Sequence, residues 1–202
     1  MAGLCASPAS ALEARVADLS AAAPFVRAAV NVKDAFPPPF RQVLADGGTL
    51  YLRIQAELWE DRTWDRLIAP RLALTFRIGR GPQTGSLTVN DPAGTQTTYP
   101  GYPALFTIHL DLAPLDRLED ERQYYVHAIA TLGTTEGREI DDVGNVVFGS
   151  DSDSSGLAAI GKYVFRKALE ITDYFQSASS ETTSRKWTGN EIRGRAAGSG
   201  PP

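Results

Sequence analysis

An alternation of apolar and polar residues with a period of two is the feature that most constrains the fold of this chain. It is clearest between Thr49 and Leu58, where every even-numbered residue is apolar and the odd-numbered residues are Thr, Tyr, Arg, Gln and Glu. Successive side chains of a β-strand point to opposite faces, so this pattern predicts a strand with one dry face and one wet face. Similar alternation recurs over residues 25–33, 71–78, 104–112 and 123–132. The chain is therefore expected to be mainly β.

Turn signals between these segments complete the expected strand order. Asp91-Pro92-Ala93-Gly94 separates residues 86–90 from residues 95–99, which predicts a hairpin. A short charged connection joins 104–112 to 123–132, so these two strands are expected to be antiparallel neighbours, and a last short strand is expected at 145–148. Seven or eight strands without an internal repeat are typical of an immunoglobulin-like antiparallel β-sandwich.

The rest of the chain divides into helical and extended segments. Residues 1–24 are expected to form an N-terminal extension with a short helix, because Ser10 and Glu13 have the spacing of a capping box. The sandwich is assigned to residues 25–150 and includes a short helix at 40–45 after three prolines. Apolar residues at helical spacing predict a long amphipathic helix over 151–178, packed on or beside the sandwich. Residues 179–202 are rich in Ser, Thr, Gly and Arg, which predicts an extended tail.

Composition limits the partners and the compartment. The formal net charge of -4 argues against a nucleic-acid-binding protein, which would carry a basic surplus. No run of apolar residues is long enough for a transmembrane segment of its own, and the single Cys5 excludes an intrachain disulfide. Ala9-Ser10-Ala11 has the form of a signal-peptidase site but lacks a full signal before it. A periplasmic or membrane-peripheral location is expected, and a missing signal peptide stays an open alternative.

Metal and cofactor sites are not predicted. His109, His127 and Asp111 are expected on the wet face of paired strands, where solvated side chains are commoner than metal ligands. Residues 151–156 resemble the first half of a calcium loop, but Lys162 stands where a bidentate Glu is needed. These acids are expected to cap the long helix. The alternative is an irregular calcium site, which would use Asp141, Asp142, Asp151 and Asp153.

Catalytic motifs are absent from the sequence. The glycine-rich residues 79–85 run from one expected strand to the next, so they lack the helix N-terminus of a phosphate-binding loop. No G-x-S-x-G, H-E-x-x-H or paired-Cys motif occurs. The chain is therefore expected not to be an enzyme, and no catalytic residue is assigned.

Tryptophan and arginine residues supply the candidate binding surface. Trp59, Arg62, Trp64 and Arg66 occur within one connection and are of the types that dominate binding hot spots. Arg185 and Trp187 form a second candidate in the tail, for a protein partner or an anionic membrane surface. The alternative for the first group is structural. In that case the two tryptophans cover the end of the sandwich, and the arginines pair with Glu60, Asp61 and Asp65.

One segment resembles a known family. The runs are Gly47-Gly48-Thr49-Leu50-Tyr51-Leu52, Leu58-Trp59-Glu60-Asp61-Arg62 and Trp64-Asp65-Arg66. They resemble a family of uncharacterised bacterial exported β-sandwich domains over roughly residues 26–132, although the order of Arg and Trp departs from the family pattern. The resemblance implies an envelope β-sandwich without an assigned activity, and it transfers no catalytic residues.

These observations lead to two main functional hypotheses, and a hydrolase with an unrecognised site at His109 or His127 is a third. The first is a non-catalytic accessory subunit that adheres to and stabilises a larger bacterial assembly, with a photosynthetic or respiratory membrane complex as the concrete example. Its partners would be protein subunits of that complex. The alternative is a free periplasmic β-sandwich module that binds a small ligand or calcium.

Overall fold

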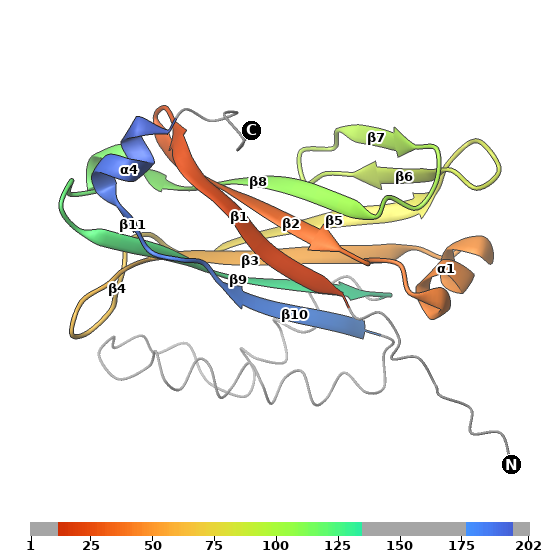
Figure 1. The fold of residues 1–202 in the computed structure, drawn as a ribbon. Helices are drawn as coiled ribbons and strands as arrows, with labels where there is room; N and C mark the ends of the chain where they lie inside the picture. Colours follow the sequence, from red (N-terminus) through yellow and green to blue (C-terminus); the bar gives the residue numbers. More distant parts are fainter. Residues whose placement is uncertain (1–11, 135–176, 196–202) are drawn as a thin grey trace, which may run out of the picture.

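The computed structural model describes residues 12–134 and 177–195. This part of the chain is mainly β and forms two antiparallel sheets (Figure 1). The first sheet has three strands in the order β1-β2-β8. They are β1 (Glu13–Ala22), β2 (Phe25–Lys33) and β8 (Leu105–Pro114).

The second sheet is larger and follows the order β10-β9-β3-β5-β6-β7. Its strands are β3 (Leu50–Glu60), β5 (Leu72–Arg80), β6 (Leu87–Asn90), β7 (Gln96–Tyr99), β9 (Gln123–Gly133) and β10 (Ser177–Thr183). Two short strands lie off this path. They are β4 (Arg66–Leu67), which pairs with β3, and β11 (Trp187–Thr188), which pairs with β9.

In the described part of the chain, three short helical segments lie at the ends of strands. They are α1 (Pro38–Ala45), the 3-10 turn η1 (Leu115–Arg117) and α4 (Gly189–Gly194). The predicted short helix at 40–45 is confirmed within α1, which buries Phe40 and Leu44. Helix α4 begins at a capping box, in which Thr188 and Glu191 each accept a hydrogen bond from the other's backbone N–H.

The alternating residues of the facing strands form the core. On β3, Leu50, Leu52 and Ile54 are almost fully buried, and on β2 the side chains of Val26 and Val30 are completely buried. Strand β1 contacts β9 and β10, β2 contacts β9, and β8 contacts β3 across the two sheets; Figure 1 shows β1 crossing β3 and β9. The buried residues of both sheets belong to one contiguous hydrophobic cluster. The two sheets are therefore held together by the dry faces that the alternation predicted.

Several predicted strands have the positions that the sequence indicated. Strand β2 has the predicted bounds, and β3, β5, β8 and β9 cover the other alternating segments. The hairpin of β6 and β7 is also confirmed. Its turn uses Gly94 at φ +85°, and the Asp91 carboxylate accepts a hydrogen bond from the N–H of Thr95 at 2.7 Å.

The expected N-terminal helix is wrong. Within residues 1–24, the segment Glu13–Ala22 is strand β1, and it pairs antiparallel with β2. The register shifts between Val16 and Asp18, which makes Ala17 the extra residue of a β-bulge. Because of this bulge, the buried side chains Val16 and Leu19 are three residues apart instead of two. That spacing is the one that imitates a helical face in the sequence.

The expected pairing of residues 104–112 with residues 123–132 is also wrong. Strand β8 pairs with β2 in the first sheet, whereas β9 lies between β10 and β3 in the second sheet. His109 therefore lies opposite Ala29, and His127 lies opposite Glu57. The connection between β8 and β9 crosses from one sheet to the other.

The expected C-terminal tail is part of the folded domain over its described residues. Residues 177–183 form β10 on the edge of the second sheet, with Ser177 opposite Gly133 and Thr183 opposite His127. Only the last two residues of the predicted helix 151–178 are described, and they belong to this strand. A polar segment rich in Ser and Thr can form an edge strand, since Thr favours strands and an edge faces water. Composition alone does not reveal the backbone partner.

Several sequence predictions lie outside the described residues. They are the strand at 145–148, the four aspartates of the alternative calcium site, and residues 151–176 of the predicted helix.

Candidate functional site

The hairpin of β3 and β4 carries most of the predicted binding residues. Its two strands pair Trp59 with Leu67 and Glu60 with Arg66, and residues 61–65 form the connecting loop. The side chain of Trp64 lies in this loop and is 87% exposed. A tryptophan side chain buries a large apolar area when it binds, so its exposure makes this loop a candidate contact surface.

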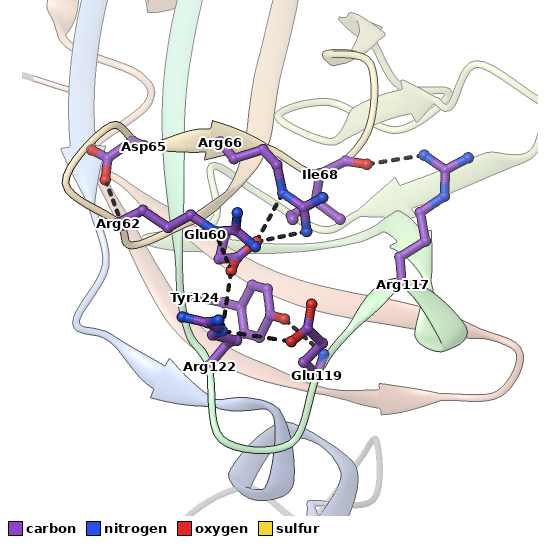
Figure 2. Close-up of polar contacts among 9 residues, drawn as sticks. All are labelled: Glu60, Arg62, Asp65, Arg66, Ile68, Arg117, Glu119, Arg122 and Tyr124. Atoms are coloured by element: carbon purple, nitrogen blue, oxygen red, sulfur yellow. Dashed lines mark hydrogen bonds and ion pairs between the residues drawn. The ribbon is translucent and has the colours of Figure 1, made fainter.

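A buried carboxylate lies at the base of the hairpin. The Glu60 side chain is 0% exposed and accepts hydrogen bonds from Nε of Arg62 at 2.5 Å and Nε of Arg66 at 2.9 Å (Figure 2). The Nε atom of Arg122 lies 3.8 Å from the same carboxylate. A buried charge without partners would be strongly destabilising, and here three guanidinium groups surround it.

The electrostatic result for Glu60 is a lowered pKa. Burial alone would raise it, because removal from water disfavours the charged form. The hydrogen bonds and charges of Arg62 and Arg66 outweigh this effect. Glu60 is therefore ionised at neutral pH and holds both arginines at the base of the hairpin.

Further hydrogen bonds hold the loop itself. Asp65 accepts a hydrogen bond from the backbone N–H of Arg62 at 3.3 Å and another from the hydroxyl of Tyr125 at 2.7 Å. Lys186, which precedes β11, forms an ion pair with Asp61 at 2.7 Å. The loop that presents Trp64 is thus connected to β9 and to the C-terminal segment, which limits its conformations before any partner binds.

The loop between β8 and β9 closes the other side of this network. The side chain of Tyr124 is completely buried, and its hydroxyl accepts a hydrogen bond from the N–H of Glu119 at 2.7 Å. Burial raises the pKa of Tyr124, so the hydroxyl stays protonated. Arg117 donates to the carbonyl of Ile68 at 2.9 Å, as Figure 2 shows. Both loops at this end of the sandwich are therefore joined by side-chain hydrogen bonds.

The six predicted binding residues lie on strands of the second sheet or on the segments that connect them, but they differ in exposure. Trp187 lies opposite Tyr124 on β9, and Tyr124 lies opposite Glu60 on β3. Trp187 is only 3% exposed, and the guanidinium of Arg185 lies 4.7 Å from the centre of its ring. Trp187 is thus a core residue, whereas Trp64 extends into solvent.

Trp59 belongs to a second polar cluster, which includes Glu57 and His127. The indole Nε1 of Trp59 donates to Glu57 at 3.1 Å, and Arg71 donates to the same carboxylate at 2.6 Å. Nδ1 of His127 lies 3.6 Å from Glu57, and its Nε2 lies 2.7 Å from Glu181 on β10. This cluster therefore connects β3, β9 and β10 across the sheet.

Burial and neighbouring side chains shift the pKa values of Glu57 and His127 in this cluster. Burial raises the pKa of Glu57, but the nearby His127 and the hydrogen bond and charge of Arg71 outweigh burial and bring the value to about 2. The nearby Glu57 carboxylate raises the pKa of His127, burial opposes this effect, and Glu181 adds to it. The contacts with Glu57 and Glu181 therefore favour the protonated form of His127.

Some residues of the site are missing from the sequence prediction. The sequence predicts Glu60 only as a counter-ion, and it does not single out Tyr124 or Arg122. A signal for Glu60 did exist, because it occupies the even-numbered position that follows Leu58 on the dry face of β3. A charge at such a position indicates a buried carboxylate that needs partners.

The described part of the chain holds neither a cluster of metal ligands nor a membrane-spanning helix. No group of three or more His, Cys, Asp or Glu residues there could hold a metal ion. No helix among residues 12–134 and 177–195 is long and apolar enough to cross a membrane. No family model, curated protein or solved structure matches this chain.

Proposed function

We propose that this chain is a non-catalytic accessory subunit that binds and stabilises a larger bacterial assembly. A membrane complex, such as a photosynthetic or respiratory complex, is the concrete candidate. The observation that carries the proposal is the 87% exposure of Trp64 on a hairpin whose base is held by buried Glu60. Tryptophan and arginine are the residues most enriched at binding hot spots.

The limited conformational freedom of the hairpin loop supports a role in binding. A flexible loop would lose conformational entropy on binding, which reduces affinity. Here Asp65 is bound to Tyr125 and Arg62, and Asp61 is bound to Lys186. The loop therefore loses much of this conformational entropy when the domain folds, and not when a partner binds.

The arginines can take part in the same contact. The side chains of Arg62 and Arg66 remain 37% and 50% exposed while they hold Glu60. Their outer surfaces can contact a partner without the loss of the buried ion pairs. The partner surface is expected to offer a pocket for Trp64 with acceptors around it.

The immunoglobulin-like arrangement and the periplasmic or membrane-peripheral location are part of this proposal. The resemblance to bacterial exported β-sandwich domains supports both. The two-sheet architecture is compatible with that class, in which binding loops are at the ends of the sandwich.

The test is gentle solubilisation of native membranes, then size separation and mass spectrometry of the fractions. Wild-type protein is expected to co-migrate with a defined membrane complex, and Trp64→Ala is expected to migrate alone. Leu105→Ala is the matched control, because Leu105 is an exposed apolar residue on β8 outside the hairpin. Migration of all three proteins as free monomers would overturn the proposal.

The second candidate function is a free periplasmic module for a small ligand or calcium. The aspartates of its calcium site lie outside the described residues. The small-ligand hypothesis has separate support in a cleft between the two sheets.

A further inference from the structure

Among residues 12–134 and 177–195, the sandwich is closed along one side and open along the other. On the closed side, β1 of the first sheet adjoins β10 of the second, where the N–H of Ala14 donates to Oγ of Ser180 at 2.9 Å. On the open side, β8 and β7 are the last strands of their sheets among the described residues. They approach through the edge-to-face rings of Tyr99 and Phe106, whose centres are 5.5 Å apart.

A cleft of about 400 Å3 lies on this open side. Its apolar lining includes Leu52, Leu74, Phe76, Ile78, Val89 and Phe106. Both faces of β8 contribute, since Phe106 and Ile108 alternate with Thr107 and His109 along the strand. The cleft therefore reaches from both faces of β8, which is an edge strand among the described residues, to apolar side chains of the second sheet. Its volume is within the range of small-molecule sites, which is roughly 300–1,000 Å3.

The polar residues of the cleft decide which charge it can accept. They are Asp91, Thr95, Thr97, Thr107 and His109. No lysine or arginine occurs among the described residues that line the cleft. The Asp91 carboxylate gives the lining a negative group, and the threonine hydroxyls provide uncharged donors and acceptors. An anionic head group would meet this carboxylate with no lysine or arginine of the described lining to balance it, whereas a cation or a neutral donor would be stabilised.

We propose that this cleft binds a small amphiphile with one apolar ring or chain and a neutral or positively charged head group. The apolar part lies against Leu52, Phe76 and Phe106, and the head group lies near Asp91 and the threonines. The inference names a ligand class for the second candidate function. It does not depend on the Trp64 hairpin, so the membrane co-migration experiment can fail without affecting it.

The probe for the full-length chain is N-phenyl-1-naphthylamine, a neutral aromatic amine that fluoresces in apolar sites. One-to-one saturable binding is expected. Thr97→Trp places a large side chain in the cleft and should weaken binding by about tenfold or more. Gln96→Trp is the matched control, because Gln96 is exposed on the same strand but does not line the cleft. Both variants are checked for an unchanged melting temperature.

The head-group preference is tested by competition. Decylamine should displace the probe, and decanoate, which has the same chain length but a negative head, should require about a tenfold higher concentration. Equal competition by the two would overturn the assigned charge preference. Absence of saturable binding, or equal binding by Thr97→Trp and wild type, would overturn the site. A shift of the wild type to dimer that Thr97→Trp abolishes would show that a second copy covers the cleft instead.

Discussion

Glu60 and Arg66 are opposite one another in the β3–β4 pair, and their side chains form an ion pair of 2.7 Å. The carboxylate is completely buried, whereas half of the Arg66 side chain faces water. The same two residues thus join the dry interior of the sandwich to the loop that exposes Trp64. This arrangement makes the shape of the hairpin depend on one buried charge.

Removal of that charge should destabilise the domain. Glu60→Gln keeps the side-chain volume but leaves Arg62 and Arg66 without their buried anion. The free energy of unfolding should fall by about 2 kcal/mol, as for a lost hydrogen bond to a charged group. Urea denaturation at neutral pH measures this difference.

The matched control for this prediction is Glu119→Gln. Glu119 is 61% exposed and lies 3.5 Å from Arg122, so its ion pair is weakened by solvent. The control should change stability by less than about 0.5 kcal/mol. Equal effects of the two substitutions would contradict the role assigned to Glu60.

Glu57 should control stability on the acidic side. Its pKa is about 2 in the folded chain and 4.5 ordinarily, so it contributes stability above pH 4.5 that is lost as the pH falls toward 2. The full contribution is about 3 kcal/mol. Glu57→Gln should flatten the stability profile between pH 4.5 and 2. An unchanged acidic limb in urea denaturation would show that Glu57 is not held by His127 and Arg71.

His127 should act in the opposite direction at higher pH. Its folded pKa lies above the ordinary 6.5, so its contribution is complete below pH 6.5 and is lost as the pH rises through the folded pKa. Glu181→Gln should lower the folded pKa, because it removes the anion 2.7 Å from Nε2. An NMR titration of the imidazole checks both statements. A pKa of His127 below 6.5 in the wild type would contradict them.

Loss of the hydrogen bond between β1 and β10 should lower the stability of the domain by less than loss of the Glu60 charge. Ser180→Ala removes the acceptor for the N–H of Ala14 and should cost about 1 kcal/mol. Ser179→Ala, one residue earlier on an exposed position of β10, should have almost no effect. Thermal unfolding of both variants measures the difference, and equal melting temperatures would argue against this closure of the sandwich.

The parts of the fold that could be predicted are those with local signals. Val26, Val30, Leu50 and Ile54 alternate without interruption, so the strands that contain them are evident from the sequence. Strand β1 could not be recognised in the same way, because the bulge at Ala17 moves Leu19 out of the period-two pattern. No turn residue or capping residue in the sequence indicates this β-bulge.

Pairing between strands was harder to predict than the strands themselves. Strand β10 pairs with β9, so Ser177 and Gly133 are neighbours although they are far apart in the chain. His109 and His127 are close in sequence but lie in different sheets. The pairing of strands depends on how the apolar faces of all the strands cover one another. No short sequence segment determines this. The grouping of the Trp and Arg residues could be predicted within the hairpin, but the burial of Trp187 depended on β11 pairing with β9.

Site-specific photocrosslinking in the native cell tests the central claim most directly. The protein is produced as Trp64→benzoylphenylalanine and, as the control, as Leu105→benzoylphenylalanine. The proposed role predicts a crosslink from position 64 to a subunit of one membrane complex, and none to that subunit from position 105. Absence of a crosslink from position 64 in folded protein at normal abundance would contradict the proposal that this hairpin binds a partner.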